Sequence, residues 1–453
     1  MGRGRHRDDR RRRRRRRLRP RTRRTRRRRS RIRHHRRHLQ HRRRRHRRRI
    51  RALPASTRSR RTRPVSALRA ALPRAALYTG GFLGPFGGSV VVSMLPEMGA
   101  DLGVTAATAA TSVTAYLGVF AAAMLFSGTL GARWGRARTV RLAYLAYAVV
   151  SVAAALAPTL TVLLGARMLQ GAANAFTTPL LLAALASLTP QNRLGRALGL
   201  FGALQAAGLT FAPLVGGLAA EIDWRWAFVV LAAAALALAC IGLPGTVDDD
   251  DTTGEPARLR DALRPRIVRI GIVALLGWGA IGGLNFLLAF RAEDVFALTP
   301  SERGALLTVL GFAGILTARR VGILVDRIGA RRTVLIGAFA GAVLVVTVGT
   351  VTNLMVVAVA WFLAGVASQC VLVGVNAAVL GDPGANRGGA VSVVQAFRFG
   401  GGAFAPLALT PVYSADPTAA FLVPAVLLAV VTPLAMPASP RPDSSGKDGV
   451  RSS

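Results

Sequence analysis

The chain contains 453 residues, 51% of them hydrophobic and 18% charged, and its formal net charge is +42. Charge-free stretches such as 102–132 and 168–192 exceed the roughly 20 apolar residues that a helix needs to cross a bilayer, which excludes a soluble globular protein. The only two cysteines, Cys240 and Cys370, lie within apolar stretches, so neither a disulfide framework nor a metal site is expected.

Residues 1–64 carry most of the charge, with 35 arginines, two aspartates and all six histidines. Such a segment cannot bury a core, and we expect a disordered leader. It could bind nucleic acid or the anionic inner leaflet through phosphate groups, without sequence specificity because no aromatic residues interrupt it. The alternative, which we favour, is that the natural protein starts at Val65 and that the leader is translated upstream sequence.

The rest of the chain predicts twelve transmembrane helices in two halves of six. The N-terminal half spans 65–244, a polar cytoplasmic linker covers 245–266, the C-terminal half spans 267–438, and a disordered cytoplasmic tail covers 439–453. The predicted helices are 76–96, 106–131, 140–158, 159–187, 197–220, 226–244, 267–290, 303–325, 333–351, 354–380, 388–411 and 418–437. The fold class is therefore an all-α membrane protein.

Arginines concentrate in alternate links between these helices. The links after helices 2, 4, 6, 8 and 10 are basic, for example at Arg133 and Arg136, whereas the remaining links carry only the arginines Arg225, Arg291 and Arg303. Cytoplasmic links of membrane proteins are enriched in arginine and lysine. Both termini are therefore expected in the cytoplasm, and the protein in the bacterial cytoplasmic membrane.

The two halves repeat at a nearly constant offset. The octapeptide that starts at Gly128 recurs 194 residues later at Gly322, Asn192-Arg193 recurs as Asn386-Arg387 at the same offset, and Phe211-Ala-Pro213 recurs as Phe404-Ala-Pro406 at 193. Each pair falls at the same point of its half. Parallel repeats of this kind place a binding site at their interface, near the bilayer midplane.

The link after helix 8 resembles the loop signature of the major facilitator superfamily, and the resemblance covers residues 75–438. The second copy is complete, whereas the first has Ala132 where the signature has aspartate. The resemblance implies a gating motif in which the carboxylate of Asp326 meets a helix N-terminus and an arginine; the first copy should be weaker, and a generic basic turn is the alternative. The motif residues are Gly128, Arg133, Gly135, Arg136, Gly322, Asp326, Arg327, Gly329 and Arg331.

Helix 5 resembles an element of drug-efflux antiporters of that superfamily. Its residues are Gly208, Pro213, Gly216 and Gly217, with Ala212 in place of a glycine. Small residues let helices approach closely, and the proline adds a bend. Ordinary small-residue packing is the alternative interpretation.

Polar residues within helices 4, 5 and 11 are the candidate substrate contacts. Arginine within a membrane is costly and is expected to face a cavity. Arg398 is the first candidate, because it lies near mid-membrane and corresponds to Gln205 under the repeat. The others are Gln395, one turn before Arg398, and Arg167, Gln170 and Asn174 on one face of helix 4. A purely structural Arg167 is the alternative.

No carboxylate lies deep in a predicted helix, and Gly88 occupies the position in helix 1 where many drug antiporters carry aspartate. Proton exchange would have to use the mouth carboxylates Glu97, Asp101, Glu293 and Asp294, or Asp326.

The sequence predicts a monomeric secondary transporter that exports a small neutral or anionic drug or metabolite, with proton antiport left open. Uptake or exchange of an organic anion or sugar is the alternative within transport. A membrane-anchored nucleic-acid or lipid-binding protein is the alternative from another class, although no specific nucleic-acid partner is expected. No catalytic residues, cofactor or metal are predicted.

Overall fold

The computed structural model describes residues 64–243, 263–381 and 387–437. The predicted leader apart from Pro64, most of the 245–266 linker, and the predicted tail lie outside the described residues. Within the described residues every regular element is helical, which confirms the all-α prediction.

The N-terminal half contains α3 (Pro64–Ser89), η1 (Val90–Met94), α4 (Leu95–Asp101), α5 (Ala106–Ala109), α6 (Thr111–Arg133), α7 (Arg136–Ala155), α8 (Leu160–Ala175), α9 (Thr178–Leu188), α10 (Gln191–Ala220) and α11 (Arg225–Ile241). The C-terminal half contains α13 (Pro265–Gly279), η2 (Gly282–Leu284), α14 (Asn285–Asp294), α15 (Pro300–Ile328), α16 (Ala330–Thr350), α17 (Leu354–Leu380), α18 (Arg387–Ala415) and α19 (Pro417–Ala435).

Each of the twelve predicted transmembrane segments overlaps helical residues, although those predicted at 140–158 and 226–244 extend past the ends of α7 at Ala155 and of α11 at Ile241. Among the described residues, ten helical segments are long and apolar enough to cross a membrane, and α11, at 17 residues, is a shorter apolar helix. The predicted start of helix 3 at residue 140 is wrong by four residues, since α7 begins at Arg136. The link between α6 and α7 is short because Gly135 adopts a φ of 88°. Residues with a Cβ atom disfavour this backbone conformation, which allows the chain to change direction within one or two residues.

Four transmembrane segments are interrupted rather than continuous within the described residues. The second breaks at the single residue Ala110, between α5 and α6. The first breaks at η1, before Pro96, and the seventh breaks at η2, within Gly282-Gly283. The fourth breaks between α8 and α9, before Pro179. Short 3₁₀ turns and helix-breaking residues are tolerated within a membrane only where neighbouring helices satisfy the freed backbone groups. The first and seventh segments are equivalent under the repeat, so the repeat is visible in the fold as well as in the sequence.

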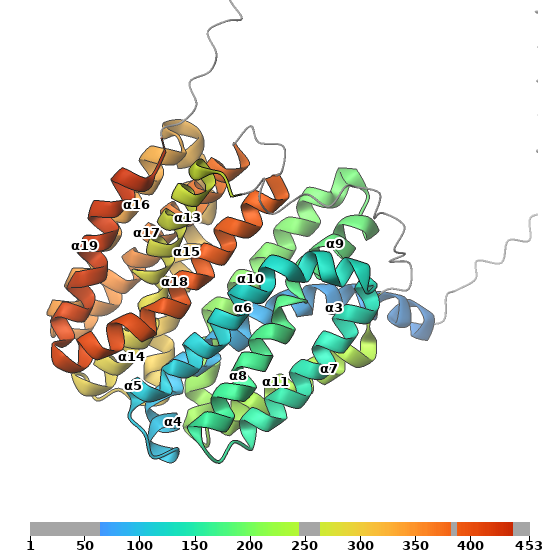
Figure 1. Cartoon of the computed structure of the whole chain (residues 1–453), viewed down its shortest axis with the longest axis horizontal. Helices are drawn as coiled ribbons and strands as arrows, with labels where there is room; N and C mark the ends of the chain where they lie inside the picture. Colours follow the sequence, from blue (N-terminus) through green and yellow to red (C-terminus); the bar gives the residue numbers. More distant parts are fainter. Residues whose placement is uncertain (1–63, 244–262, 382–386, 438–453) are drawn as a thin grey trace, which may run out of the picture. The chain divides into compact units, whose positions relative to one another are not determined.

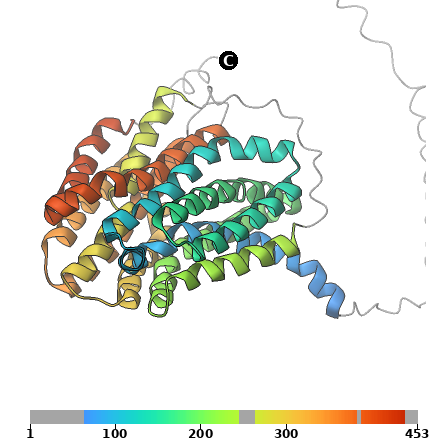
Figure 2. The same cartoon turned by 60° about the horizontal axis from the view of Figure 1, so that its bottom comes forward.

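The helices form two groups that correspond to the two halves of the chain. Figures 1 and 2 show α3 to α11 in one group and α13 to α19 in the other, in both views. Within the groups, α7 packs on α8 and α11, and α16 packs on α17 and α19. Between the groups, α10 packs on α15 and α6 packs on α18. These four helices form the boundary between the halves.

Candidate functional site

A buried arginine joins the two halves where α4 and α14 meet the start of α15. We call this the closed end. The side chain of Arg303 on α15 is only 3% exposed and makes an ion pair with Glu97 on α4. Its Nε donates to the carbonyl oxygen of Ser93 in η1 at 3.3 Å, and its Nη1 donates to that of Leu298 at 3.1 Å. The carboxylate of Glu293, in its own half, lies 3.8 Å from Nη1.

Helices α10 and α15 touch through glycines next to this arginine. A Cβ atom at Gly304 would lie less than 3.0 Å from the carbonyl oxygen of Pro213, and one at Gly217 would lie equally close to that of Pro300. Real Cβ atoms essentially never approach so closely. Two further glycines of the helix 5 motif, Gly208 and Gly216, pack in the same way against carbonyls of the first segment. Gly217 of this motif therefore faces the other half, whereas Gly208 and Gly216 face their own.

A hydrogen bond continues this contact at the end of α10. The backbone N–H of Ser301 donates to the carboxylate of Glu221 at 3.1 Å. Hydrogen bonds from Ser301 lower the pKa of Glu221 below its ordinary value. Glu221 and Ser301 belong to different halves, so this bond, like the Glu97–Arg303 pair, exists only while this end is closed.

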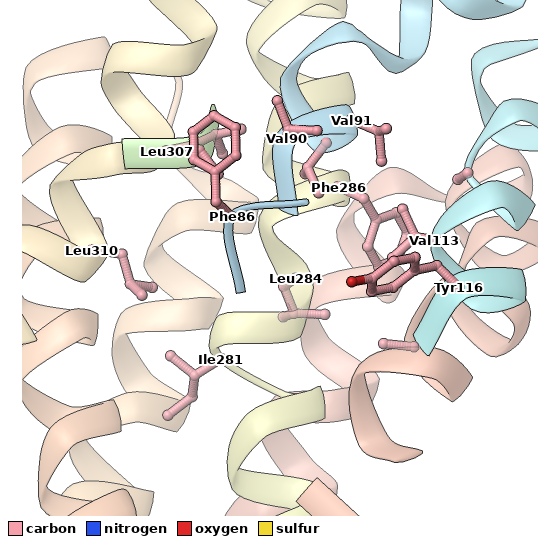
Figure 3. Close-up of a cluster of buried hydrophobic side chains, with 14 of the residues drawn as sticks. Phe86, Val90, Val91, Val113, Tyr116, Ile281, Leu284, Phe286, Leu307 and Leu310 are labelled. Carbon is pink, nitrogen blue, oxygen red and sulfur yellow. The ribbon is translucent and has the colours of Figure 1, made fainter. Parts of the chain in front are cut away.

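An apolar cluster fills the boundary beside these polar contacts. Figure 3 shows side chains of both halves gathered around the break at η1. All ten labelled residues are buried: Phe86, Val90, Val91, Val113 and Tyr116 come from the N-terminal half, and Ile281, Leu284, Phe286, Leu307 and Leu310 come from the C-terminal half. Further along the boundary, Thr114 on α6 donates a hydrogen bond to the carbonyl oxygen of Ala403 on α18 at 2.8 Å. Within the described residues, the halves are thus sealed at the closed end by one ion pair, glycine contacts and an apolar cluster.

The opposite end carries the gating motif and is packed more loosely. Gly135 and Gly329 have φ values of 88° and 86°, so the motif needs glycine at both repeat positions. Arg133, Asp326 and Arg327 are exposed, and within the described residues Asp326 makes no ion pair. Arg331 instead donates to the carbonyl oxygen of Met436, beyond α19.

Glycines at this end also face open space. A Cβ atom at Gly199, Gly202 or Gly322 would meet nothing within 4 Å, in contrast to Gly217 and Gly304 at the closed end. The side chain of Ala132 and the surroundings of Gly128 lie outside what the structure describes. The carboxylate clamp that the motif implies is therefore not formed by Asp326 in this conformation, and its role in gating stays a prediction.

A small hollow of about 20 Å³, enough for about one water molecule, lies between α13, α17 and α18 in this conformation. The guanidinium of Arg398 lies 4.2 Å from the ring centre of Trp278 and 5.3 Å from that of Phe399. The Nε atom of Arg398 and the Oε1 atom of Gln395 are buried without a hydrogen-bond partner among the described residues. The lining residues are Ala274, Gly277, Trp278, Ser368, Val371, Leu372, Val375, Asn376, Val394, Gln395 and Arg398. We call this hollow the Arg398 pocket.

Two of the predicted substrate contacts, Arg398 and Gln395, line this pocket, whereas Gln205 is partly exposed on α10 and does not. All lining residues come from the C-terminal half, and not from both halves as the repeat led us to expect. Sequence reasoning missed Trp278, Ser368 and Asn376. Asn376 had a signal, since it is a polar residue in the long charge-free stretch 333–381.

The polar residues of helix 4 lie inside the N-terminal half. Arg167 is fully buried, and its guanidinium donates to the carbonyl oxygens of Gly87 at 3.0 Å and Gly88 at 3.3 Å. It also donates to Oε1 of Gln170 at 3.0 Å and lies 4.3 Å from the ring centre of Tyr116. Carbonyl dipoles and an aromatic face thus take the place of an acidic partner.

The other two residues of this face complete the network. Gln170 donates to the hydroxyl of Ser151 at 2.8 Å, and Asn174 donates to that of Tyr116 at 2.8 Å. Arg167, Gln170 and Asn174 line no part of the Arg398 pocket. In this conformation they tie α8 to α3, α6 and α7, and their contact with a substrate stays a prediction.

Comparisons with known proteins agree with this architecture. A family model described as the Major Facilitator Superfamily matches residues 77–319 and 270–452. The puromycin resistance protein pur8 of Streptomyces alboniger is 35% identical over 176 residues, which is 38% of this chain and 34% of that protein. The MFS antiporter QDR3 of Candida albicans is 30% identical over 174 residues, 37% of this chain and 25% of that protein. The matched regions thus span about a third or less of these curated relatives.

Solved structures share the fold at low sequence identity. A mutant form of the nucleoside transporter NupG has a TM-score of 0.67 and 15% identity, covering 80% of this chain and 98% of that one. The human organic anion transporter MFSD10 (TETRAN) has a TM-score of 0.59 and 18% identity, covering 81% and 99%.

Proposed function

Because the chain belongs to the Major Facilitator Superfamily, we propose that it is a secondary transporter that exports a small neutral or anionic compound across the bacterial cytoplasmic membrane. The Arg398 pocket is the observation that carries the proposal. It combines an apolar lining with a few convergent polar groups, which is the usual make-up of a small-molecule site.

The chemistry of the pocket favours a particular substrate class. No acidic residue lines it, so nothing there would balance a cationic compound. Among the described residues, the buried Nε of Arg398 and Oε1 of Gln395 lack partners, and a bound acceptor or donor would relieve the cost of leaving them unpaired. The face of Trp278 would accept an aromatic or apolar body. A flat compound that carries a carboxylate or a strong hydrogen-bond acceptor fits these groups best.

The direction of transport is proposed from the helix 5 motif and from the relatives. Gly217 and Pro213 of this motif lie in the contact between α10 and α15, where an efflux-type hinge would act. One similar protein is named for puromycin resistance and another is named an antiporter. Following the arginine asymmetry of the links, we assign the closed end to the outside and the gating motif to the cytoplasm.

The proposal is tested with the purified full chain in proteoliposomes. A panel of anionic, neutral and cationic compounds is loaded, and efflux is compared with that of empty liposomes. We expect efflux of anionic or neutral members, which Arg398→Ala reduces and Arg319→Ala, at an exposed arginine of α15 outside the pocket, leaves intact. Transport of cations alone, or equal loss in both variants, would overturn the assignment. Transport of a compound in the opposite direction would indicate uptake instead of export.

A further inference from the structure

The Arg398 pocket is lined only by the C-terminal half, yet one aromatic contact connects it to the other half. The ring of Phe120 on α6 meets the ring of Phe399 on α18 edge to face, with 5.0 Å between the ring centres and an angle of 90° between the rings. Phe399 directly follows Arg398, and its ring centre lies 5.3 Å from the guanidinium. A side chain that flanks Arg398 is therefore itself held by a residue of the N-terminal half.

Phe120 is the fixed member of this contact. It is 5% exposed, and its ring stacks on that of Tyr116 one turn earlier, with 6.2 Å between the ring centres and an angle of 12°. Tyr116 is fixed in turn, because its hydroxyl accepts from Asn174 at 2.8 Å and the guanidinium of Arg167 lies 4.3 Å from its ring centre. A continuous series of aromatic and cation–π contacts thus leads from Arg167 in one half to the Arg398 pocket in the other.

Trp278, the other aromatic neighbour of Arg398, has little room to move. Its ring centre lies 4.2 Å from the guanidinium. A Cβ atom at Gly282 would lie 3.0 Å from the indole ring, and one at Gly402 would lie 2.9 Å from its Nε1 atom. The indole therefore packs directly against the chain on two sides. Phe399 is thus the ring that can leave the guanidinium, once Phe120 no longer holds it.

In this conformation the Arg398 pocket has space for about one water molecule, so a substrate reaches the guanidinium only after a side chain has moved aside. We infer that Phe120 is a positioning residue of the pocket: it holds Phe399 against Arg398, and a movement of α6 relative to α18 releases Phe399 and opens the pocket. The inference rests on the proposed function in treating the pocket as the substrate site. An aromatic part of the substrate would then replace the ring of Phe399 beside the guanidinium.

The other contacts between α6 and α18 allow this step to be isolated. Thr114 donates to the carbonyl oxygen of Ala403 at 2.8 Å, and a Cβ atom at Gly118 would lie 4.0 Å from that of Ala403. Neither contact involves Phe399. Removal of the Phe120 ring should therefore free Phe399 without separating the two helices.

The test measures access to the pocket without any transported compound. In the full chain, Cys370→Ser removes the buried cysteine, Ser368→Cys places a thiol in the pocket lining, and the exposed Cys240 is kept as an internal reference. The protein in nanodiscs is treated with N-ethylmaleimide, and mass spectrometry of its peptides records the labelling rate of each thiol. Because the reagent reaches the pocket only in its open form, the ratio of the pocket rate to the Cys240 rate follows the population of that form.

Phe120→Leu, which keeps an apolar side chain but no ring, should raise this ratio about 2- to 13-fold, the typical contribution of an aromatic pair to an equilibrium. Phe120→Tyr, which keeps the ring, should retain the low ratio. Phe399→Leu should raise the ratio at least as much as Phe120→Leu does. The double leucine variant should match Phe399→Leu alone, because Phe120 acts only through Phe399. Phe339→Leu, the same substitution at an exposed ring of α16 outside the pocket, should leave the ratio unchanged.

Two results would overturn the inference: a Phe120→Leu variant with the ratio of the unsubstituted chain, or a double variant whose effect is the product of the two single effects. General loosening of the helix packing would raise the rates at both thiols and leave their ratio unchanged, which is the first of these results. Both results come from labelling alone, whereas the proposed function is judged by efflux, so the failure of one is distinguishable from the failure of the other.

Discussion

Replacing Gly304 by alanine should weaken closure. The new Cβ would lie 2.9 Å from the Cα of Leu214 and closer still to the carbonyl oxygen of Pro213, whereas ordinary contact begins at 3.4 Å. Both neighbours are backbone atoms, so α10 and α15 must move apart by at least several tenths of an ångström. Overpacking of this kind costs about 1–3 kcal/mol, which corresponds to a roughly 5- to 150-fold fall in the closed-to-open ratio.

Gly314→Ala is the matched control on the same helix. The nearest atom to its Cβ, Oε1 of Gln369, would lie at 3.5 Å, which is ordinary contact. Both substitutions gain the same helix propensity, so their difference reports only the contact between the halves. Spin labels at Ala100→Cys and Val295→Cys, both at exposed positions of the closed end, report the distance between the halves by pulsed electron paramagnetic resonance. Gly304→Ala should lengthen this distance relative to the unsubstituted chain, whereas Gly314→Ala should leave it unchanged. An equal shift in both variants, or none in either, would rule out the glycine contact as a determinant of closure.

Three further predictions concern the gate, the pocket and the leader. Asp326→Asn should reduce transport far more than substitution of Ala132, because only the second motif copy keeps its carboxylate; equal tolerance at both positions in the flux assay would remove the clamp. Arg398→Ala should weaken substrate binding by about tenfold or more, and Arg398→Lys should restore it only in part, because ammonium lacks the planar fork of guanidinium; unchanged affinity with a collapsed melting temperature would make Arg398 structural. A chain that begins at Val65 should insert and transport as the full chain does, and loss of both activities would give residues 1–64 a role.

The helices could be predicted because each corresponds to a long apolar stretch and because the same pattern of stretches occurs in both halves of the chain. Each segment is an apolar stretch of roughly the length of a bilayer, and the repeat supplies a second reading of the same pattern. The interruptions at η1 and η2 could not be placed in advance, because Pro96 and Gly282 permit a break whereas tertiary packing decides whether it occurs. Both breaks lie in the boundary that seals the closed end.

The two candidate arginines show the limit of the sequence for the site. Arg167 and Arg398 are both arginines within apolar helices, and from sequence both were expected to face a cavity. Aromatic faces meet both guanidinium groups. The structure separates them through the backbone: the carbonyls of Gly87 and Gly88 reach Arg167, whereas the Nε of Arg398 is buried without a partner among the described residues. The residue pattern of a helix does not show which backbone carbonyls of a neighbouring helix will reach its side chains. This distinction therefore could not be predicted from the sequence.

The proposed transport function requires the two halves to open alternately at their two ends, and this is tested by observing both ends at once. Label pairs would report the closed end, at Ala100 and Val295, and the gating-motif end, at Leu198 on α10 and Ile323 on α15, all of which are exposed. During addition of a compound that the proteoliposomes export, we expect one distance to lengthen as the other shortens. Distances that lengthen together, or that stay fixed while the compound is transported, would contradict alternate opening.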